Sequence, residues 1–210
     1  MFSSTADVVD WFENCEFLAS LPREISPEIR ELCDMLDAEA PVVVQVEPTP
    51  DAELMKCFSN VEDAVADGLG EVQTGWLIWE FSGVYLVAER HAVLQTNDGL
   101  LDITPQPEGY RRVLFAATPT PLPTEYTPCR YVALKDHPLV HRFVELMSRN
   151  QILSGMGQFR SAEFHRNDAE AARSLRNFLA LERKRQSRKQ TKDRRSKRKA
   201  ERQRRRRSRR

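Results

Sequence analysis

Three side chains with complementary chemistry follow one another along the chain: the thiol of Cys57, the imidazole of His91 and the carboxylate of Asp102. An imidazole that takes the proton of a thiol produces a thiolate nucleophile, and a carboxylate beside the imidazole orients it. This order predicts a catalytic triad in which Cys57 is the nucleophile, His91 the general base and later acid, and Asp102 the orienting group. The oxyanion would be held by the backbone N–H of Cys57 and by one further donor that the sequence leaves open.

One helix and one strand hairpin must position these side chains. Helical spacing over about residues 51–68 puts Cys57 near the start of a helix, where the pKa of a thiol is lowered. His91 lies in a long run of strand-forming residues, and Asp102 lies in a shorter run. The turn signal at residues 97–99 joins the two runs and predicts a hairpin that brings His91 beside Asp102.

Each of these residues also has a plainer interpretation. Cys57 can be a small core residue, since free cysteine is commonly buried in apolar surroundings. Asp102 can cap the turn that follows the hairpin. Strand alternation adds a condition for the triad: the helix must pack on the strand face that carries His91. On the face of Ala88 and Arg90 the triad fails unless a bulge intervenes, and the sequence leaves the choice of face open.

The order of helix cysteine, strand histidine and strand aspartate resembles the papain-like and transglutaminase-like superfamily. A closer similarity is to uncharacterised bacterial and phage proteins. These share a core like Gly75-Trp76-Leu77-Ile78-Trp79-Glu80, followed by a His-Ala-Val strand and a Leu-Asp-Ile-Thr-Pro segment. The resemblance covers about residues 51–118 and departs at Val93, where transglutaminase-like cores usually carry an aromatic residue. It implies a papain-like core with the same triad and indicates no particular reaction.

Charge is segregated along the chain, although the net charge of the 210 residues is only +1. Residues 183–210 hold 18 of the 32 Lys and Arg residues and two acidic residues, a net of +16, whereas the rest of the chain has a net of −15. Arginine side chains fit phosphate oxygens and release counterions on binding, so this segment predicts non-specific contact with RNA or DNA. The candidate contacts are Arg194, Arg195, Arg198, Arg204, Arg205, Arg206 and Arg207.

The basic segment also bears on specificity and location. No aromatic residue follows Phe178, so base stacking and sequence-specific recognition are not expected. Its plainer interpretation is an extension that solubilises the chain or neutralises the acidic body. We expect a cytoplasmic protein, or a nuclear one if the source is eukaryotic or viral, because the same basic run would then serve as a nuclear address.

Several other kinds of site are not predicted. The four cysteines form no C-x-x-C pair, which argues against a zinc knuckle or a dense disulfide framework, and Cys15 and Cys33 lie on apolar helix faces as core residues do. His137 and His141 have the spacing of two ligands on one helix but lack a third, so we expect a solvated or capping pair and no metal. No cofactor is expected. No apolar run is long enough to span a membrane, and the first residues do not form a signal peptide.

The expected fold class is α+β, with a central helix packed on an antiparallel sheet of about four strands, a papain-like or transglutaminase-like core. An N-terminal helical cap would occupy residues 1–50, including a helix at 5–19, and the core residues 51–118. A proline-rich linker with a helical extension would follow at 119–181, and a basic disordered tail at 182–210.

The predicted function is a cysteine-dependent acyl-transfer enzyme, amidase-like or peptidase-like, with a protein or peptide substrate and a basic tail that binds nucleic acid. The alternative is a non-enzymatic adaptor with an inert papain-like core.

Overall fold

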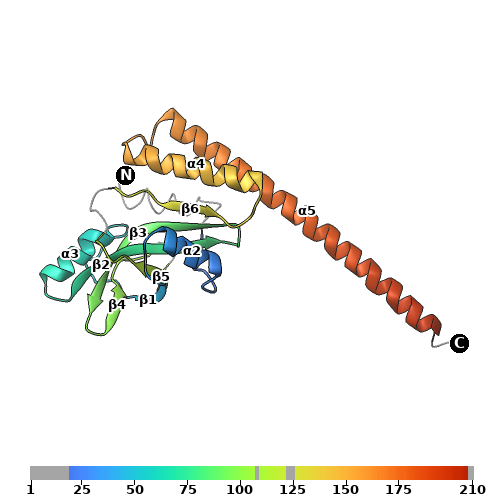
Figure 1. Ribbon diagram of the computed structural model, residues 1–210, viewed down its shortest axis with the longest axis horizontal. Coiled ribbons are helices and arrows are strands. Elements are labelled where there is room, and N and C mark those ends of the chain that lie inside the picture. The colour runs from blue at the N-terminus through green and yellow to red at the C-terminus, as the bar shows by residue number, and fades with distance from the viewer. Residues whose placement is uncertain (1–18, 107–108, 122–125, 208–210) are drawn as a thin grey trace.

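The computed structural model of the chain describes residues 19–106, 109–121 and 126–207, with side chains up to Lys197. The helix predicted at residues 5–19, with Cys15, lies outside these residues except for its last position. The described part is α+β, as predicted (Figure 1). Its elements are, in chain order, α2 (Pro27–Met35), β1 (Val42–Val46), α3 (Cys57–Ala66), β2 (Glu71–Phe81), β3 (Tyr85–Thr96), β4 (Gly99–Asp102), β5 (Arg112–Ala117), β6 (Arg130–Ala133), α4 (Pro138–Gly155) and α5 (Ala162–Arg207).

The described strands form one sheet in the order β2-β5-β1-β4-β3-β6, and an additional β2–β3 pairing closes the first five into a barrel. This differs from the antiparallel sheet of about four strands that the sequence predicts. The difference comes from β1, which sequence analysis assigned to the N-terminal cap. It pairs antiparallel with β5 and parallel with β4, so it completes the barrel and gives the sheet a parallel pair. Residue 50 is therefore not a boundary between separate units.

One edge of β3 is left open in its middle. Along its other edge β3 pairs with β2 from Tyr85 to Gln95. On the open edge β6 pairs with Tyr85–Ala88 and β4 pairs with Leu94–Thr96. Within the described part of the chain, residues 89–93 have no strand partner on that edge. This gap in the sheet lies where the first turn of α3 meets β3.

Three apolar clusters hold the elements together. The largest joins side chains of β1, β2, β3 and β5 with α4 and α5, and includes Phe115 and Leu175. A second lies under α2, where Ile29 and Leu32 pack on the opposite faces of β2, β3 and β5. The third joins α3 to β3 and to Ile103, just after β4. The α3 helix is thus fastened to the hairpin that carries His91 and Asp102.

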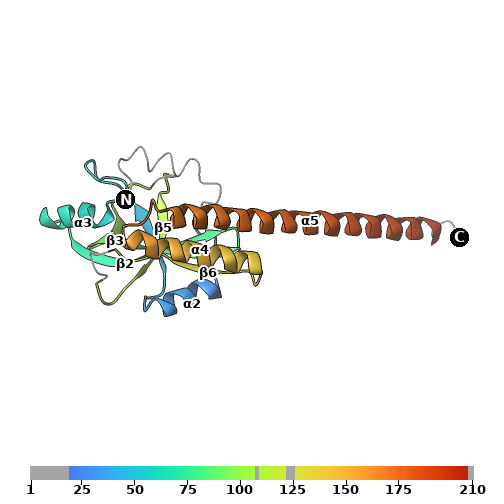
Figure 2. The same cartoon turned by 90° about the horizontal axis from the view of Figure 1, so that it is seen from above.

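The α4 and α5 helices pack against each other over β6, and α5 then continues away from the body (Figures 1 and 2). It is 46 residues long and runs to Arg207, whereas the sequence predicted a disordered tail from residue 182. The physical reason is local: residues 183–207 contain no proline or glycine and are rich in arginine, lysine and glutamine, which favour helix. The docked first half also removes the cost of nucleating a new helix. No helix among the described residues is long and apolar enough to cross a membrane.

Candidate active site

Cys57 is the first residue of α3, six positions later than the helix start that the sequence predicted. Its helix face continues into Asn60, Val61 and Ala64, which are buried against β3, so the thiol points toward the same strand. Just before the helix, Met55 has a φ of 62°, a left-handed conformation that is strained for a residue with a side chain. The chain turns sharply there and presents Cys57 at the very end of the helix.

Asn60 fixes the chain that leads into α3. Its side chain accepts a hydrogen bond from the N–H of Glu53 at 2.9 Å and donates to the carbonyl of Glu53 at 2.8 Å. It also donates to the hydroxyl of Thr104 at 3.1 Å, just beyond β4. Sequence analysis missed this residue. The available signal was a polar residue in the apolar stripe of a helix, a position that asparagine rarely takes without a specific hydrogen bond.

His91 and Asp102 lie on the same face of the β3–β4 hairpin. Leu94 is opposite Leu101, so Asp102 stands opposite Val93 and diagonal to His91, and it directs its carboxylate to the same side. The His91 Nε2 atom is 3.1 Å from Asp102 Oδ1. The two side chains are 6% and 0% exposed, so their contact is shielded from water. The ring N–H does not point squarely at the oxygen, a looseness common in sites without substrate.

The carboxylate of Asp102 is held by two further donors. Its Oδ1 accepts from the N–H of Thr104 at 3.0 Å, and its Oδ2 accepts from the side-chain amide of Gln106 at 2.8 Å. The bond to Thr104 is the turn-capping contact proposed as the plain interpretation of Asp102. The same carboxylate therefore caps the turn and faces the imidazole. Asn60 and Asp102 also meet at Thr104, which links the start of α3 to the carboxylate.

The thiol of Cys57 and the imidazole of His91 interact through charge and a hydrogen bond. Burial raises the pKa of the thiol, but the charge of His91, its hydrogen bond and the N–H of Ala92 outweigh burial, and the net pKa lies below the usual value. Burial also disfavours a charged imidazole, yet the Cys57 thiolate and the Asp102 carboxylate raise the pKa of His91 to about 10. The pairing therefore favours transfer of the thiol proton to His91 and stabilises the thiolate. Because Nε2 faces Asp102, Nδ1 is the nitrogen left for the sulfur.

The α3 helix packs on the strand face that strand alternation seemed to exclude. Phe58 stacks on Arg90, and the helix covers Ala92 and Leu94 on the same face. The open stretch of β3 explains how His91 still reaches the thiol. Backbone N–H groups lie in the plane of a sheet, so a sulfur that accepts from the N–H of Ala92 lies beside the strand edge rather than over either face. Side chains from both faces can reach it there, and no bulge is needed.

The start of α3 also offers backbone donors. Lys56, the N-cap residue, makes no side-chain capping hydrogen bond, and its side chain forms an ion pair with Glu53 at 2.8 Å. The helical backbone bonds begin with the N–H of Asn60, which donates to the carbonyl of Lys56. The N–H groups of the preceding residues, Cys57 included, have no acceptor within the helix. Backbone N–H groups at a helix start are donors of the kind that a developing oxyanion needs.

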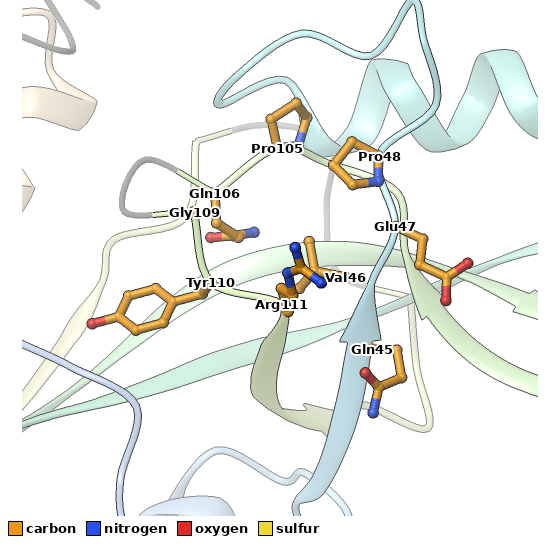
Figure 3. Close-up of a pocket in the computed structure, with 9 residues that line it drawn as sticks. All are labelled: Gln45, Val46, Glu47, Pro48, Pro105, Gln106, Gly109, Tyr110 and Arg111. Carbon is orange, nitrogen blue, oxygen red and sulfur yellow. The ribbon is translucent and has the colours of Figure 1, made fainter.

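A depression of about 540 Å³ adjoins the site on the far side of Gln106. Figure 3 shows the side chain of Gln106 directed into this depression, with Pro105 and Pro48 closing one side. Its lining, within the described residues, is Gln45, Val46, Glu47, Pro48, Pro105, Gln106, Gly109, Tyr110 and Arg111. No triad residue lines it. Its link to the triad is the hydrogen bond from Gln106 to Asp102.

Comparison with known proteins adds no relative to this geometry. No family model, curated protein or solved structure matches the chain. The triad has to be judged on its own distances and electrostatics.

The remaining sequence-predicted residues lie apart from the triad. Cys33 lies on the buried face of α2. His137 caps α4, where its Nδ1 accepts from the N–H of Leu139 at 3.2 Å, and His141 lies 3.1 Å from Asp136. Among the described residues no three His, Cys, Asp or Glu side chains gather in a group that could hold a metal ion.

The basic residues of the predicted nucleic-acid site lie along the projecting part of α5. Arg194 and Arg195 are exposed there. The side chains of Arg198, Arg204, Arg205, Arg206 and Arg207 lie outside the described side chains, although their backbone is helical.

Proposed function

We propose that this chain is a cysteine-dependent acyl-transfer enzyme that cleaves or exchanges amide bonds in a protein or peptide substrate. The observation that carries the proposal is the pairing of Cys57 with His91, which lowers the pKa of the thiol despite its burial. A structural cysteine in a core has no such partner, and its pKa rises. The chain order of Cys57, His91 and Asp102 is also that of papain-like and transglutaminase-like enzymes, and we propose membership of that superfamily on this basis.

In the proposed reaction the Cys57 thiolate attacks the carbonyl carbon of the amide. The oxyanion that forms is stabilised by backbone N–H groups at the start of α3. The C–N bond then breaks, His91 gives its proton to the leaving nitrogen, and a thioester remains on Cys57. Water, or a second amine, next attacks the thioester while His91 takes its proton. The new acid or amide leaves, and the proton on His91 again faces the Cys57 thiolate.

The Asp102 carboxylate acts throughout on His91. It favours the imidazolium over the neutral ring and fixes which nitrogen faces the sulfur. Thr104 and Gln106 hold the carboxylate in place, so rotation of the imidazole would lose its contact with Asp102.

The decisive experiment is labelling with an equimolar thiol-reactive probe at pH 7, read by intact mass and peptide mapping. We expect a single adduct on Cys57, because it is the one described cysteine whose pKa is lowered. The Cys57→Ser variant should remain unlabelled under the same conditions, whereas Cys33→Ser should label as the parent does. Labelling spread evenly over several cysteines, or seen only after unfolding, would contradict the enzyme and favour the inert adaptor.

A second function, non-specific binding of RNA or DNA, is supported by α5. The helix projects from the body (Figures 1 and 2), and its described side chains from Lys184 to Lys197 are nearly all exposed, with only one acid, Asp193, among them. Such a helix matches the phosphate backbone by charge and carries no aromatic residue to stack on bases.

We expect salt-dependent binding to a duplex of arbitrary sequence, which a titration at several salt concentrations measures. Replacing the four arginines 204–207 by glutamine should lower the slope of log affinity against log salt by about 3 to 4. Replacing the same residues by lysine keeps the charge and should keep the slope. Binding that is insensitive to salt, or that distinguishes between two sequences, would argue that the body and not the helix makes the contact.

A further inference from the structure

A permanent cation stands beside the nucleophile and has no part in the reaction described so far. Arg90 directly precedes His91 in β3, so its side chain lies on the opposite face of the strand. Its guanidinium carbon is 3.7 Å from the centroid of the Phe58 ring, a close stacking contact. Phe58 follows Cys57 in α3. The stack therefore fixes a positive charge next to the residue that carries the nucleophile.

The charge of Arg90 is felt at the sulfur. Burial lowers the pKa of the guanidinium, and the negative charge of the Cys57 thiolate opposes that effect. Arginine does not exchange its proton in this pH range, so it cannot replace His91 as the base. What Arg90 offers is a fixed positive charge and N–H donors that lie in the guanidinium plane, whereas the stack with Phe58 uses its face.

The stack lies on the more exposed side of the site. His91 and Asp102 are buried, whereas Cys57, Phe58 and Arg90 are each partly exposed. Arg90 and the residue that carries the thiol are therefore both within reach of solvent. The other cation at the helix start, Lys56, is ion-paired with Glu53, so its charge is largely balanced locally.

We propose that Arg90 determines substrate specificity by binding a carboxylate of the acyl group, close to the carbonyl that Cys57 attacks. The proposal rests on the proposed acyl-transfer function. The substrate class would be acidic: an acyl group that carries a carboxylate, as the side chain of an acidic residue or as a small organic acid. A planar guanidinium held by stacking suits this role, because arginine and carboxylate pair through two parallel hydrogen bonds.

The test compares two alkylating reagents of nearly the same size, of which only one carries a carboxylate that Arg90 could bind. Iodoacetate carries a carboxylate next to its reactive carbon, and iodoacetamide carries a neutral amide in the same place. Rates of Cys57 alkylation by each are measured at pH 7 in the full-length chain by mass spectrometry. We expect the iodoacetate-to-iodoacetamide ratio to fall about fivefold in Arg90→Gln, the loss expected from one partly exposed ion pair. In Arg90→Lys it should fall part of the way, because lysine keeps the charge but cannot form the two parallel hydrogen bonds.

Two further variants keep the test sharp. Lys56→Gln removes the positive charge that directly precedes Cys57 in the sequence and should change the ratio less than twofold. Phe58→Leu removes the stack but not the charge, and should lower the ratio part of the way. Circular dichroism melts check that each variant is folded. If Arg90→Gln does not fold, the ratios measured for Phe58→Leu and Arg90→Lys still test the role of Arg90.

The outcomes separate this proposal from the enzyme itself. If both reagents label Cys57 selectively but Arg90→Gln leaves the ratio unchanged, or slows both reagents equally, the specificity role is overturned while the enzyme stands. If neither reagent prefers Cys57 over the other cysteines, the proposed function fails and this inference fails with it. With the ratio as expected, peptidyl chloromethyl ketones ending in Asp or Asn identify the source of the carboxylate. A preference for Asp indicates a peptide side chain, and no preference indicates a small acid.

Discussion

Cys57 and Cys129 both lie beside β3, but the side chains of β3 that lie near the two thiols carry opposite charges. Cys57 meets His91, whereas Cys129, just before β6, lies near Glu89. Glu89 and His91 are two residues apart in β3 and belong to the same strand face. Burial raises the pKa of both thiols. At Cys129 the negative charge of Glu89 raises it further, but at Cys57 the imidazolium more than reverses the effect.

This comparison teaches that burial alone does not decide the reactivity of a thiol. Cys33, in α2, supplies the reference: burial and the charge of Asp34 raise its pKa to about 11, and the charge of Arg30 does not outweigh them. The charge on one neighbouring side chain decides whether the pKa of a buried thiol falls or rises. Four experiments test this difference between the thiols, and their expected effects decrease in the order given.

Removing the imidazole should have the largest effect. In His91→Ala the Cys57 thiol keeps its burial but loses the charge that favours the thiolate. We expect its alkylation rate at pH 7 to fall about thirtyfold, because an ordinary thiol is only a few per cent ionised there. Iodoacetamide labelling kinetics measure it. His141→Ala, an exposed histidine paired with Asp136, is the control and should label as the parent does.

Changing the pH should separate the two cysteines by up to about tenfold per unit. Between pH 7 and 6 the labelling of an ordinary thiol falls tenfold, because its thiolate fraction does. The pKa of Cys57 is lowered by His91, so its thiolate fraction, and with it its labelling rate, should fall less steeply over that unit. At the alkaline end His91 loses its proton near pH 10 and the ion pair ends. A Cys57 profile that follows the other cysteines would mean that no ion pair forms.

Neutralising the orienting carboxylate should cost about fivefold in Cys57 labelling. Asp102→Asn removes a negative charge that raises the pKa of His91, and its amide group would oppose the donor of Gln106. Any turnover should fall more steeply, because orientation matters most in the transition state. Asp98→Asn, the same change at the exposed hairpin turn, is the control. An Asp102→Asn variant with parental labelling and an unchanged melt would leave this residue as a turn cap alone.

Removing the charge beside Cys129 should have the smallest effect. In Glu89→Gln the amide can still accept the hydrogen bond that Trp79 Nε1 gives to Glu89 at 3.1 Å. The pKa of Cys129 should fall because one of its two causes is gone, while burial remains the larger. We expect its labelling to rise about twofold at pH 8, with Cys57 labelled as before. Glu71→Gln, an exposed acid at the far end of β2, should change neither rate.

The hairpin could be predicted from the sequence because its information is local. The turn at residues 97–99 sets the register, and the register alone brings Asp102 diagonal to His91. The place of β1 could not be predicted in this way. Its parallel pairing with β4 joins residues more than fifty positions apart, and no local pattern marks a strand that enters between two others. The sheet therefore closes where the sequence indicated an open one.

Strand alternation predicted that α3 must pack on the face of β3 that carries His91. That prediction assumes that the thiol contacts the strand over one of its faces. The gap at residues 89–93 lets the thiol sit at the strand edge, and an unpaired stretch in a long strand leaves no trace in composition. Asn60 was overlooked because its partners, Glu53 and Thr104, are brought to it by the fold. The extent of α5 was underestimated because an absent apolar stripe was given more weight than the helix propensity of arginine and lysine.

The length of α5 sets a distance scale for the whole molecule. Its last 25 residues or so, beyond the body, extend about 35 to 40 Å at helical rise. In both views α3 lies at the end of the body away from this arm (Figures 1 and 2). If the projecting part of α5 binds RNA or DNA, the thiol of Cys57 is held at a distance from the nucleic acid and does not contact it. The enzyme would then meet substrates that lie within the length of α5 from the nucleic acid. Their effective concentration would depend on that length rather than on their bulk concentration.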